Sequence, residues 1–385
     1  MATFPRSLWP SSRDRKGETR FRGRQVGRSR SVFGPDSVGM RQSLVALTFS
    51  SLTAVVAGGF LAGMTGTLER NPGLLVLIPA AIGMRGNIFG ALGSRLATSI
   101  HAGTFRMSRR NDSLVIQNAI ATASLSLVTA LVLAVLTKVL APIFGLSSVI
   151  AISDLIVMSV IGSLLSFIVL IAVTLALAAR SAERGWDLDD VNAPLVSAVG
   201  DVVTLPALLV ASLLLEMSNF TVVLSAIVIV ATLVSLGWVR QSRLSLVRLI
   251  LWESLPILLA TGIVLVIAGV VIEHELAAFA ENRAMLILVP SCLGTAGAIG
   301  GILSARMSSK FHLGVIEPVA VPGRLARRDF IAALLIAVPV LLLNGFLAQL
   351  TSQVFGFASP GVASLVSISV LGGALATLLA GAIAY

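Results

Sequence analysis

The chain has 385 residues, of which 56% are hydrophobic and 12% charged, and its mean hydropathy is +0.97. A soluble domain carries about 25% charged residues, so this composition indicates a polytopic membrane protein. The single cysteine, Cys292, excludes a disulfide framework or a cysteine metal cluster, and the three scattered histidines disfavour a zinc site. The net charge of +10 does not indicate nucleic-acid binding, because it lies mostly in the N-terminal region and short loops, where it reports membrane topology.

Residues 1–41 form a region of their own that is rich in arginine, poor in acidic residues and without an apolar period. This composition predicts a basic, disordered cytoplasmic tail. It also fits an organellar transit peptide, and a third reading is that translation starts at Met40.

Ten apolar segments follow, each long enough to cross the roughly 30 Å hydrocarbon core. Their predicted bounds are Ser43–Gly66, Gly73–His101, Leu114–Leu140, Leu155–Ala179, Ala193–Glu216, Thr221–Val239, Leu249–Ile272, Ala284–Lys310, Phe330–Leu350 and Val362–Ala384. We expect a turn over Thr67–Gly73. Arginines cluster after the second, fourth, sixth and eighth segments, for example Arg106 and Arg324. The positive-inside rule therefore places both termini in the cytoplasm of a multi-pass protein of the cell membrane.

One stretch occurs twice. Adding 211 to the residue numbers of Pro79–Gly103 gives Pro290–Gly314 without a gap, and the two share several glycine, proline, arginine and histidine positions. The shift of six spans is even, so the copies point the same way. We expect an all-α fold with two parallel repeated halves, a pseudo-dimer about an axis along the membrane normal. The halves would be residues 42–216, with five helices, and 246–385, which lacks the fifth, joined by a linker helix over 217–245.

Polar residues interrupt the second span near its middle, where Arg85 and Asn87 lie among glycines such as Gly86. A charged residue at that depth costs about 2.5–3.5 kcal/mol on insertion scales. Exposed backbone and polar groups are tolerated in a membrane only against protein or along a water-filled path. The pattern is compatible with a tightly packed helix pair and with a pore lining.

The fifth span carries the second polar group. We expect Asp201 to be the only acidic residue deep within a span, and Ser197 and Thr204 share its helical face. An unpaired carboxylate in lipid is unfavourable. Asp201 should therefore pair with Arg95 or Arg85, or form part of a cation site. The acidic run of residues 187–190 either gathers cations at the cytoplasmic mouth or is simply a solvated loop.

These two segments resemble solute carrier family 41, which is related to the MgtE-type bacterial magnesium transporters. The stretch PAAIGMRGNIFGALGSRLATSIHAG resembles the family's Gly-Asn and Ser-Arg-Leu-Ser-Thr pattern, and APLVSAVGDVVTLPALL resembles its Gly-Asp-x-x-Thr-Leu helix. The resemblance covers nearly all of residues 42–385. It implies divalent-cation transport, chiefly of Mg²⁺, in a fold where one chain supplies both halves of what MgtE-type proteins build as a homodimer.

Carried over position by position, the resemblance makes Asp201 the ion-path aspartate and Gly86 and Asn87 the Gly-Asn pair. With Thr204 and Ser197 these form the candidate metal site. The second copy has Ala298 in place of the asparagine, and the cytoplasmic sensor domain of MgtE-type proteins has no counterpart. The missing fifth helix predicts an asymmetric path, a second associating chain, or a gene that continues past residue 385.

The function predicted from the sequence is transport of Mg²⁺ and other divalent cations through a lipid bilayer, with no cofactor and no nucleic acid involved. A Mg²⁺-dependent membrane enzyme acting on a lipid phosphate and a proton- or sodium-coupled solute carrier are the alternatives. The sequence fits a channel and a carrier, and uptake and efflux, equally well.

Overall fold

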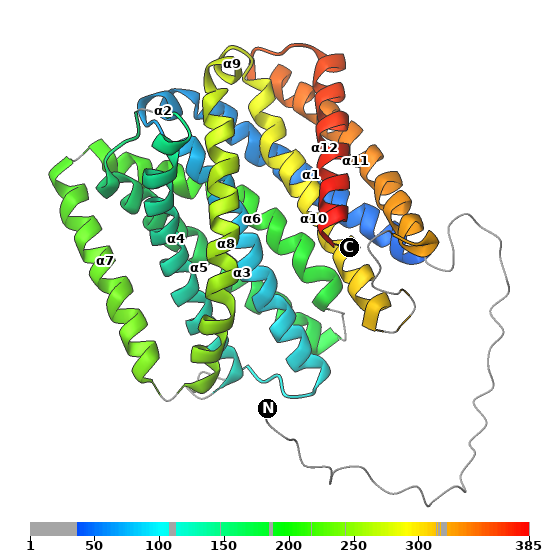
Figure 1. The fold of residues 1–385 in the computed structure, drawn as a ribbon, viewed down its shortest axis with the longest axis horizontal. Coiled ribbons are helices and arrows are strands. Elements are labelled where there is room, and N and C mark those ends of the chain that lie inside the picture. The colour runs from blue at the N-terminus through cyan, green and yellow to red at the C-terminus, as the bar shows by residue number, and fades with distance from the viewer. Residues whose placement is uncertain are drawn as a thin grey trace, which may run out of the picture. The chain divides into compact units, whose positions relative to one another are not determined.

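The computed structural model describes residues 37–107, 113–146, 148–184, 188–216, 218–242, 244–312, 314, 316 and 322–384. Residues 39–385 form one unit, and its arrangement is described here by itself (Figure 1). The regular elements in these ranges are all helical: α1 (Ser37–Gly63), α2 (Thr65–Arg70), α3 (Leu74–His101), α4 (Leu114–Ile143), α5 (Ile152–Arg184), α6 (Leu188–Ser212), the 3₁₀ turn η1 (Leu213–Glu216), α7 (Ser218–Gln241), α8 (Ser245–His274), α9 (Leu276–Glu281), α10 (Ala284–His312), α11 (Arg324–Phe355) and α12 (Val362–Ala384).

The long helices coincide with the predicted spans. Within the described residues, nine helices are long and apolar enough to cross a membrane, namely α3 to α8 and α10 to α12. The remaining predicted span, Ser43–Gly66, falls on α1, whose described apolar part, Leu47–Gly63, is shorter. The chain is therefore an all-α, multi-pass membrane protein. The predicted N-terminal tail lies outside the described residues up to residue 36.

The predicted turn over Thr67–Gly73 is wrong for residues 67–70, which belong to the short helix α2, and is confirmed for residues 71–73. Leu68 of α2 is fully buried, and the Thr65 hydroxyl donates to the Ala62 carbonyl at the end of α1. The buried leucine holds this helical turn against the protein. The short helix α9 occupies the equivalent position before α10.

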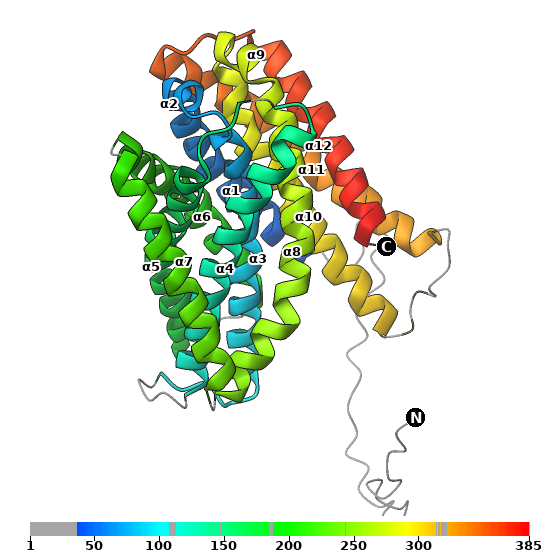
Figure 2. The same ribbon diagram turned by 60° about the vertical axis from the view of Figure 1, so that its left-hand side comes forward.

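When 211 is added to each residue number, the bounds of α2, α3 and α4 match those of α9, α10 and α11 within one residue, and α5 and α12 begin within one residue of each other. The turns after the helices match as well. Gly103 and Gly314 have φ of 68° and 66°, and Gly145 and Gly356 have φ of 94° and 68°. This left-handed conformation favours glycine, which explains the residue type at all four positions. In both views α2 and α9 lie at the same end of the helices (Figures 1 and 2).

The first helix of each half, α1 or α8, packs against a helix of the other half. At Gly58 of α1 an added Cβ would lie 2.6 Å from the Cα of Ile287 in α10. At Gly269 of α8 an added Cβ would lie 2.9 Å from the Cα of Val76 in α3. Both partners are related by the same offset of 211, so the two contacts are reciprocal. Reciprocal contacts of this kind are what a two-fold relation between two halves requires.

A buried polar network reinforces the placement of α1. The Ser51 hydroxyl of α1 donates to Oδ1 of Asn344 in α11. The Asn344 amide in turn donates to the Ser291 carbonyl and to the Thr295 hydroxyl of α10, at 3.3 and 3.1 Å. Interhelical hydrogen bonds of this type hold membrane helices together, as expected for a single amide on an apolar helix. The network joins three helices that are distant in the sequence.

Candidate cation path between the two halves

The helix that carries the predicted ion-path aspartate lies where the two halves meet. Helix α6 packs along α3 and α5 of its own half and also reaches α10 of the other half. It stays helical through Pro206, although proline cannot donate to the carbonyl four residues earlier. Its polar residues therefore lie on one continuous helical face.

Asp201 is buried in this region, with only 3% of its surface exposed. Its Oδ2 atom has no hydrogen-bond partner among the described residues. A Cβ added to Gly294 of α10 would lie 3.6 Å from that oxygen, so the carboxylate of one half faces a glycine of the other. The equivalent glycine of the first half, Gly83, faces Leu265 of α8 instead. The two halves thus differ at this position.

Of the two alternatives predicted for Asp201, the salt bridge to Arg95 or Arg85 is absent from the described part of the chain. Arg95 instead donates from Nε to Oδ1 of Asn118 in α4, at 2.7 Å. Arg85 is 5% exposed, and its Nε and Nη1 atoms have no hydrogen-bond partner in the described ranges. Arg95 already holds α3 to α4, so it is not the partner of the carboxylate.

The other predicted ligands fall into two groups. Thr204 lies one turn after Asp201, is fully buried and donates its hydroxyl to the Gly200 carbonyl at 2.5 Å, which leaves its oxygen lone pairs available. Ser197 lies one turn before Asp201 and is partly buried. Asn87 and Gly86 belong to α3 and are exposed. Among the described residues no hydrogen bond joins the α3 pair to Asp201, so the structure groups three of the five residues on α6 and leaves two apart.

Helices α3 and α10 each present an open stripe of small residues. A Cβ added at Gly86 or Gly90 of α3 would meet no atom within 4 Å, and the same holds for the equivalent Gly297 and Gly301 of α10. On α3 the exposed stripe continues toward the end of the helix through Asn87, Ala91, Ser94 and Thr98. The duplicated glycines therefore leave open surface on both helices. Only α3 adds a side-chain amide to it.

The chemistry available near Asp201 is that of oxygen ligands. In the part of the chain that the structure describes, no group of three or more histidine, cysteine, aspartate or glutamate side chains comes together. A dehydrated metal ion held by several carboxylates is therefore not supported there. Asp187 of the acidic run lies outside the described residues, as do the side chains of Asp189 and Asp190.

Glu273 is a second buried acidic residue, which the sequence alone does not single out. Glu273 lies at the end of α8, is 8% exposed and accepts a hydrogen bond from the Gly73 backbone N–H at 3.0 Å. Gly73 immediately precedes α3, whose first N–H groups lack partners within the helix. A carboxylate is favourable at that helix end. The predicted span stopped at Ile272, one residue too early to include it.

The profile of the MgtE family, described as a divalent cation transporter, matches residues 78–211 and 289–385. This chain belongs to that family. The two matched segments begin 211 residues apart, which is the offset of the repeat. They contain the helices that carry Asp201, Asn87 and Gly294.

Three curated relatives of this MgtE-family chain belong to solute carrier family 41. Member 3 from Mus musculus is 24% identical over 247 residues, which cover 62% of this chain and 50% of that protein. Member 3 from Rattus norvegicus is 23% identical over 247 residues, covering 62% and 52%. Member 2 from Gallus gallus is 25% identical over 265 residues, covering 66% and 44%. The chain thus matches about half the length of these relatives. No solved structure matches it significantly.

Proposed function

We propose that this chain transports divalent cations, chiefly Mg²⁺, across the membrane along a path between its two halves. The observation that carries the proposal is the buried carboxylate of Asp201, which has no described partner and faces Gly294 of the opposite half. A charged group in such a position is costly unless a ligand or water stabilises it, and such groups mark ion pathways in membrane proteins. Membership in a transporter family supports the same conclusion.

The proposed site combines Asp201, Thr204 and Ser197 of α6 with Asn87 and the backbone at Gly86 of α3. Mg²⁺ prefers octahedral oxygen ligands and loses its waters reluctantly, so proteins commonly bind it through one or two carboxylates and retained waters. One carboxylate with neutral oxygens fits a hydrated ion. The exposed α3 residues would contact it through water. Weak contacts of this kind also let the ion leave, which conduction requires. Mg²⁺ is the transported ion in this proposal, and the transport requires no cofactor.

We further propose that the halves form a parallel pseudo-dimer, with a two-fold axis along the membrane normal. The reciprocal contacts of Gly58 with Ile287 and of Gly269 with Val76 support this arrangement. The axis would run between α3 and α10. Within the described residues, the acidic residue of the proposed path comes from α6 of the first half. Association with a second copy of the chain would be an additional step.

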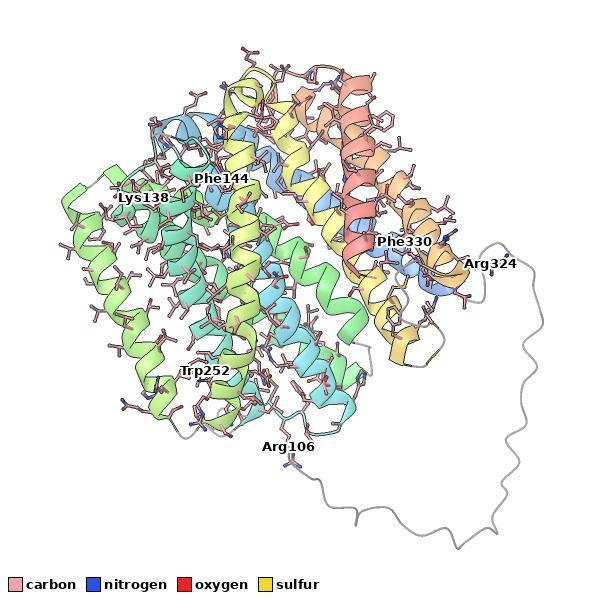
Figure 3. All side chains as sticks on the ribbon, viewed as in Figure 1. Arg106, Lys138, Phe144, Trp252, Arg324 and Phe330 are labelled. Carbon is pink, nitrogen blue, oxygen red and sulfur yellow. The ribbon has the colours of Figure 1, made fainter. Side chains whose placement is uncertain are left out.

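We propose that the chain lies in the cell membrane with both termini on the cytoplasmic side. Arg106, in the loop after α3, projects at the same end of the helices as Trp252, whereas Lys138 and Phe144 lie at the opposite end (Figure 3). Lys138 donates to the Val149 and Ile150 carbonyls at 3.0 and 2.9 Å. Because these hydrogen bonds hold the Lys138 side chain against the protein, we do not count it among the loop cations that indicate the membrane orientation. Arg106 is exposed and marks the cytoplasmic end under the positive-inside rule.

Transport can be tested with purified protein in liposomes that contain a Mg²⁺-sensitive dye. An inward Mg²⁺ gradient should raise the internal signal only in liposomes with protein, and the signal should persist without sodium or proton gradients if the path is a channel. A lipid-phosphate enzyme would release phosphate without moving Mg²⁺. A solute carrier would move Mg²⁺ only together with its solute. Liposomes with folded protein and no Mg²⁺ flux under any gradient would refute the proposal.

A further inference from the structure

Arg85 is a buried cation for which the proposed transport path has no use. It lies near the middle of α3, a helix that spans the membrane, and is 5% exposed. An arginine side chain stays protonated at neutral pH, because its guanidinium is a very weak acid. Burying such a charge without a partner is highly unfavourable. The described residues supply no hydrogen-bond partner for its Nε and Nη1 atoms.

The guanidinium borders a small cavity inside the first half. Helix α4 contributes Ser126 and Thr129 to its lining and helix α5 contributes Ser159 and Ser163, while the rest of the lining is apolar apart from Arg85 itself. The space is about that of one water-sized species. No carboxylate is among the lining residues. The cavity therefore lies between three helices and is lined by hydroxyls and one positive charge as well as by apolar side chains.

The hydroxyls differ in what they can offer to a ligand. Thr129 donates to the Leu125 carbonyl and Ser159 to the Ala130 carbonyl, both at 2.7 Å, so the protons of these two hydroxyls are already used. The Ser126 hydroxyl has no hydrogen-bond partner in the described ranges. Ser163 donates to the Ser126 carbonyl at 3.5 Å. The donors left to bind a ligand are thus the Arg85 N–H groups and the Ser126 O–H, and the guanidinium is the charged one among them.

We propose that the cavity beside Arg85 binds one small anion, chloride in the cell. The guanidinium repels cations. A neutral water in the cavity would leave its positive charge uncompensated. A halide accepts several hydrogen bonds at once and neutralises the charge. The water-sized space favours a monatomic halide over a polyatomic anion such as gluconate. The site lies on the α4 and α5 side of α3, and it is separate from the exposed stripe that carries Asn87.

The proposal can be tested by chloride titration of the full chain in detergent, with binding measured from the ³⁵Cl NMR linewidth. All solutions would contain sodium salts without Mg²⁺, so the result does not depend on transport. Wild-type protein should broaden the chloride signal. Bromide should displace the bound chloride and gluconate should not. Arg85→Gln should weaken binding at least about tenfold, because it removes charge-assisted hydrogen bonds.

Two further variants keep the test decisive. Arg106→Gln removes the same charge from an exposed loop after α3 and should bind chloride like the wild type. Ser126→Ala keeps the charge, removes the one free hydroxyl and should weaken binding several-fold even if Arg85→Gln does not fold. The proposal is overturned if the wild type does not broaden the signal. It is also overturned if a folded Arg85→Gln protein binds chloride as the wild type does. If Arg85→Gln does not fold, wild-type chloride binding by Ser126→Ala overturns the proposal instead.

Discussion

At the scale of single residues, the buried Arg85 and the partly buried Arg95 of α3 have different roles. Arg95 is tied to Asn118 by a hydrogen bond of 2.7 Å, whereas Arg85 faces a hydroxyl-lined cavity. Both were candidates to neutralise Asp201 from the sequence, because helical spacing alone does not fix which neighbour a long side chain reaches. The structure leaves the carboxylate to face Gly294 instead. The charge of Asp201 is therefore available for a ligand.

We predict that Asp201 and Arg95 are energetically independent. In a double-mutant cycle, the unfolding free energies of Asp201→Asn and Arg95→Gln should add within about 0.5 kcal/mol. Arg95→Gln and Asn118→Ala should instead couple by about 1–3 kcal/mol, because they share a hydrogen bond to a charged group. Chemical denaturation in detergent measures both cycles. A coupling above about 1 kcal/mol between Asp201 and Arg95 would indicate a salt bridge between them and contradict this prediction.

At the scale of helices, the close contacts of α1 with α10 and of α8 with α3 depend on glycine. A Cβ at Gly58 or Gly269 would overlap the backbone of the opposing helix, which cannot give way as a flexible side chain can. Small residues at such crossings let helices approach closely in membranes. Both contacts belong to the exchange of first helices between the halves.

Gly58→Ala and Gly269→Ala should each destabilise the protein, by about 1–3 kcal/mol for an overpacked contact. Gly63→Ala is the matched control, because it lies in the same helix α1 and a Cβ there would meet no atom within 4 Å. The control should be neutral or slightly stabilising, since alanine is the better helix former. Thermal unfolding in detergent would compare them. Equal stability of Gly58→Ala and Gly63→Ala would contradict the close helix contact.

At the scale of the whole molecule, the first helix of each half packs in the other half. This predicts a disulfide within one chain between Ser51→Cys and Asn344→Cys, whose wild-type side chains are in direct contact. The native Cys292 would be replaced by alanine. Cleavage between α7 and α8 should then give two fragments that separate only after reduction. Fragments that separate without reduction, or a cross-link that forms only between two chains, would contradict the exchange.

Much of this architecture could be predicted from the sequence. The features that could not be predicted all depend on contacts between residues that are distant in the sequence. The spans, the repeat of Pro79–Gly103 and the polar face of α6 follow from hydropathy, spacing and glycine positions. The exchange of α1 and α8 could not be predicted, since contacts between distant helices leave no period in a sequence. Glu273 escaped because its partner, the Gly73 N–H, is two hundred residues away. The cavity beside Arg85 likewise depends on three helices at once.

The central claim is that the Asp201 carboxylate binds the transported Mg²⁺, and Asp201→Asn tests it most directly. The amide keeps the shape and removes the charge, so the protein should fold while Mg²⁺ flux in liposomes falls at least about tenfold. Glu273→Gln is the matched control, because it neutralises the other buried acid and should lower stability while leaving flux near the wild-type level. Wild-type flux through a well-folded Asp201→Asn protein would contradict the claim.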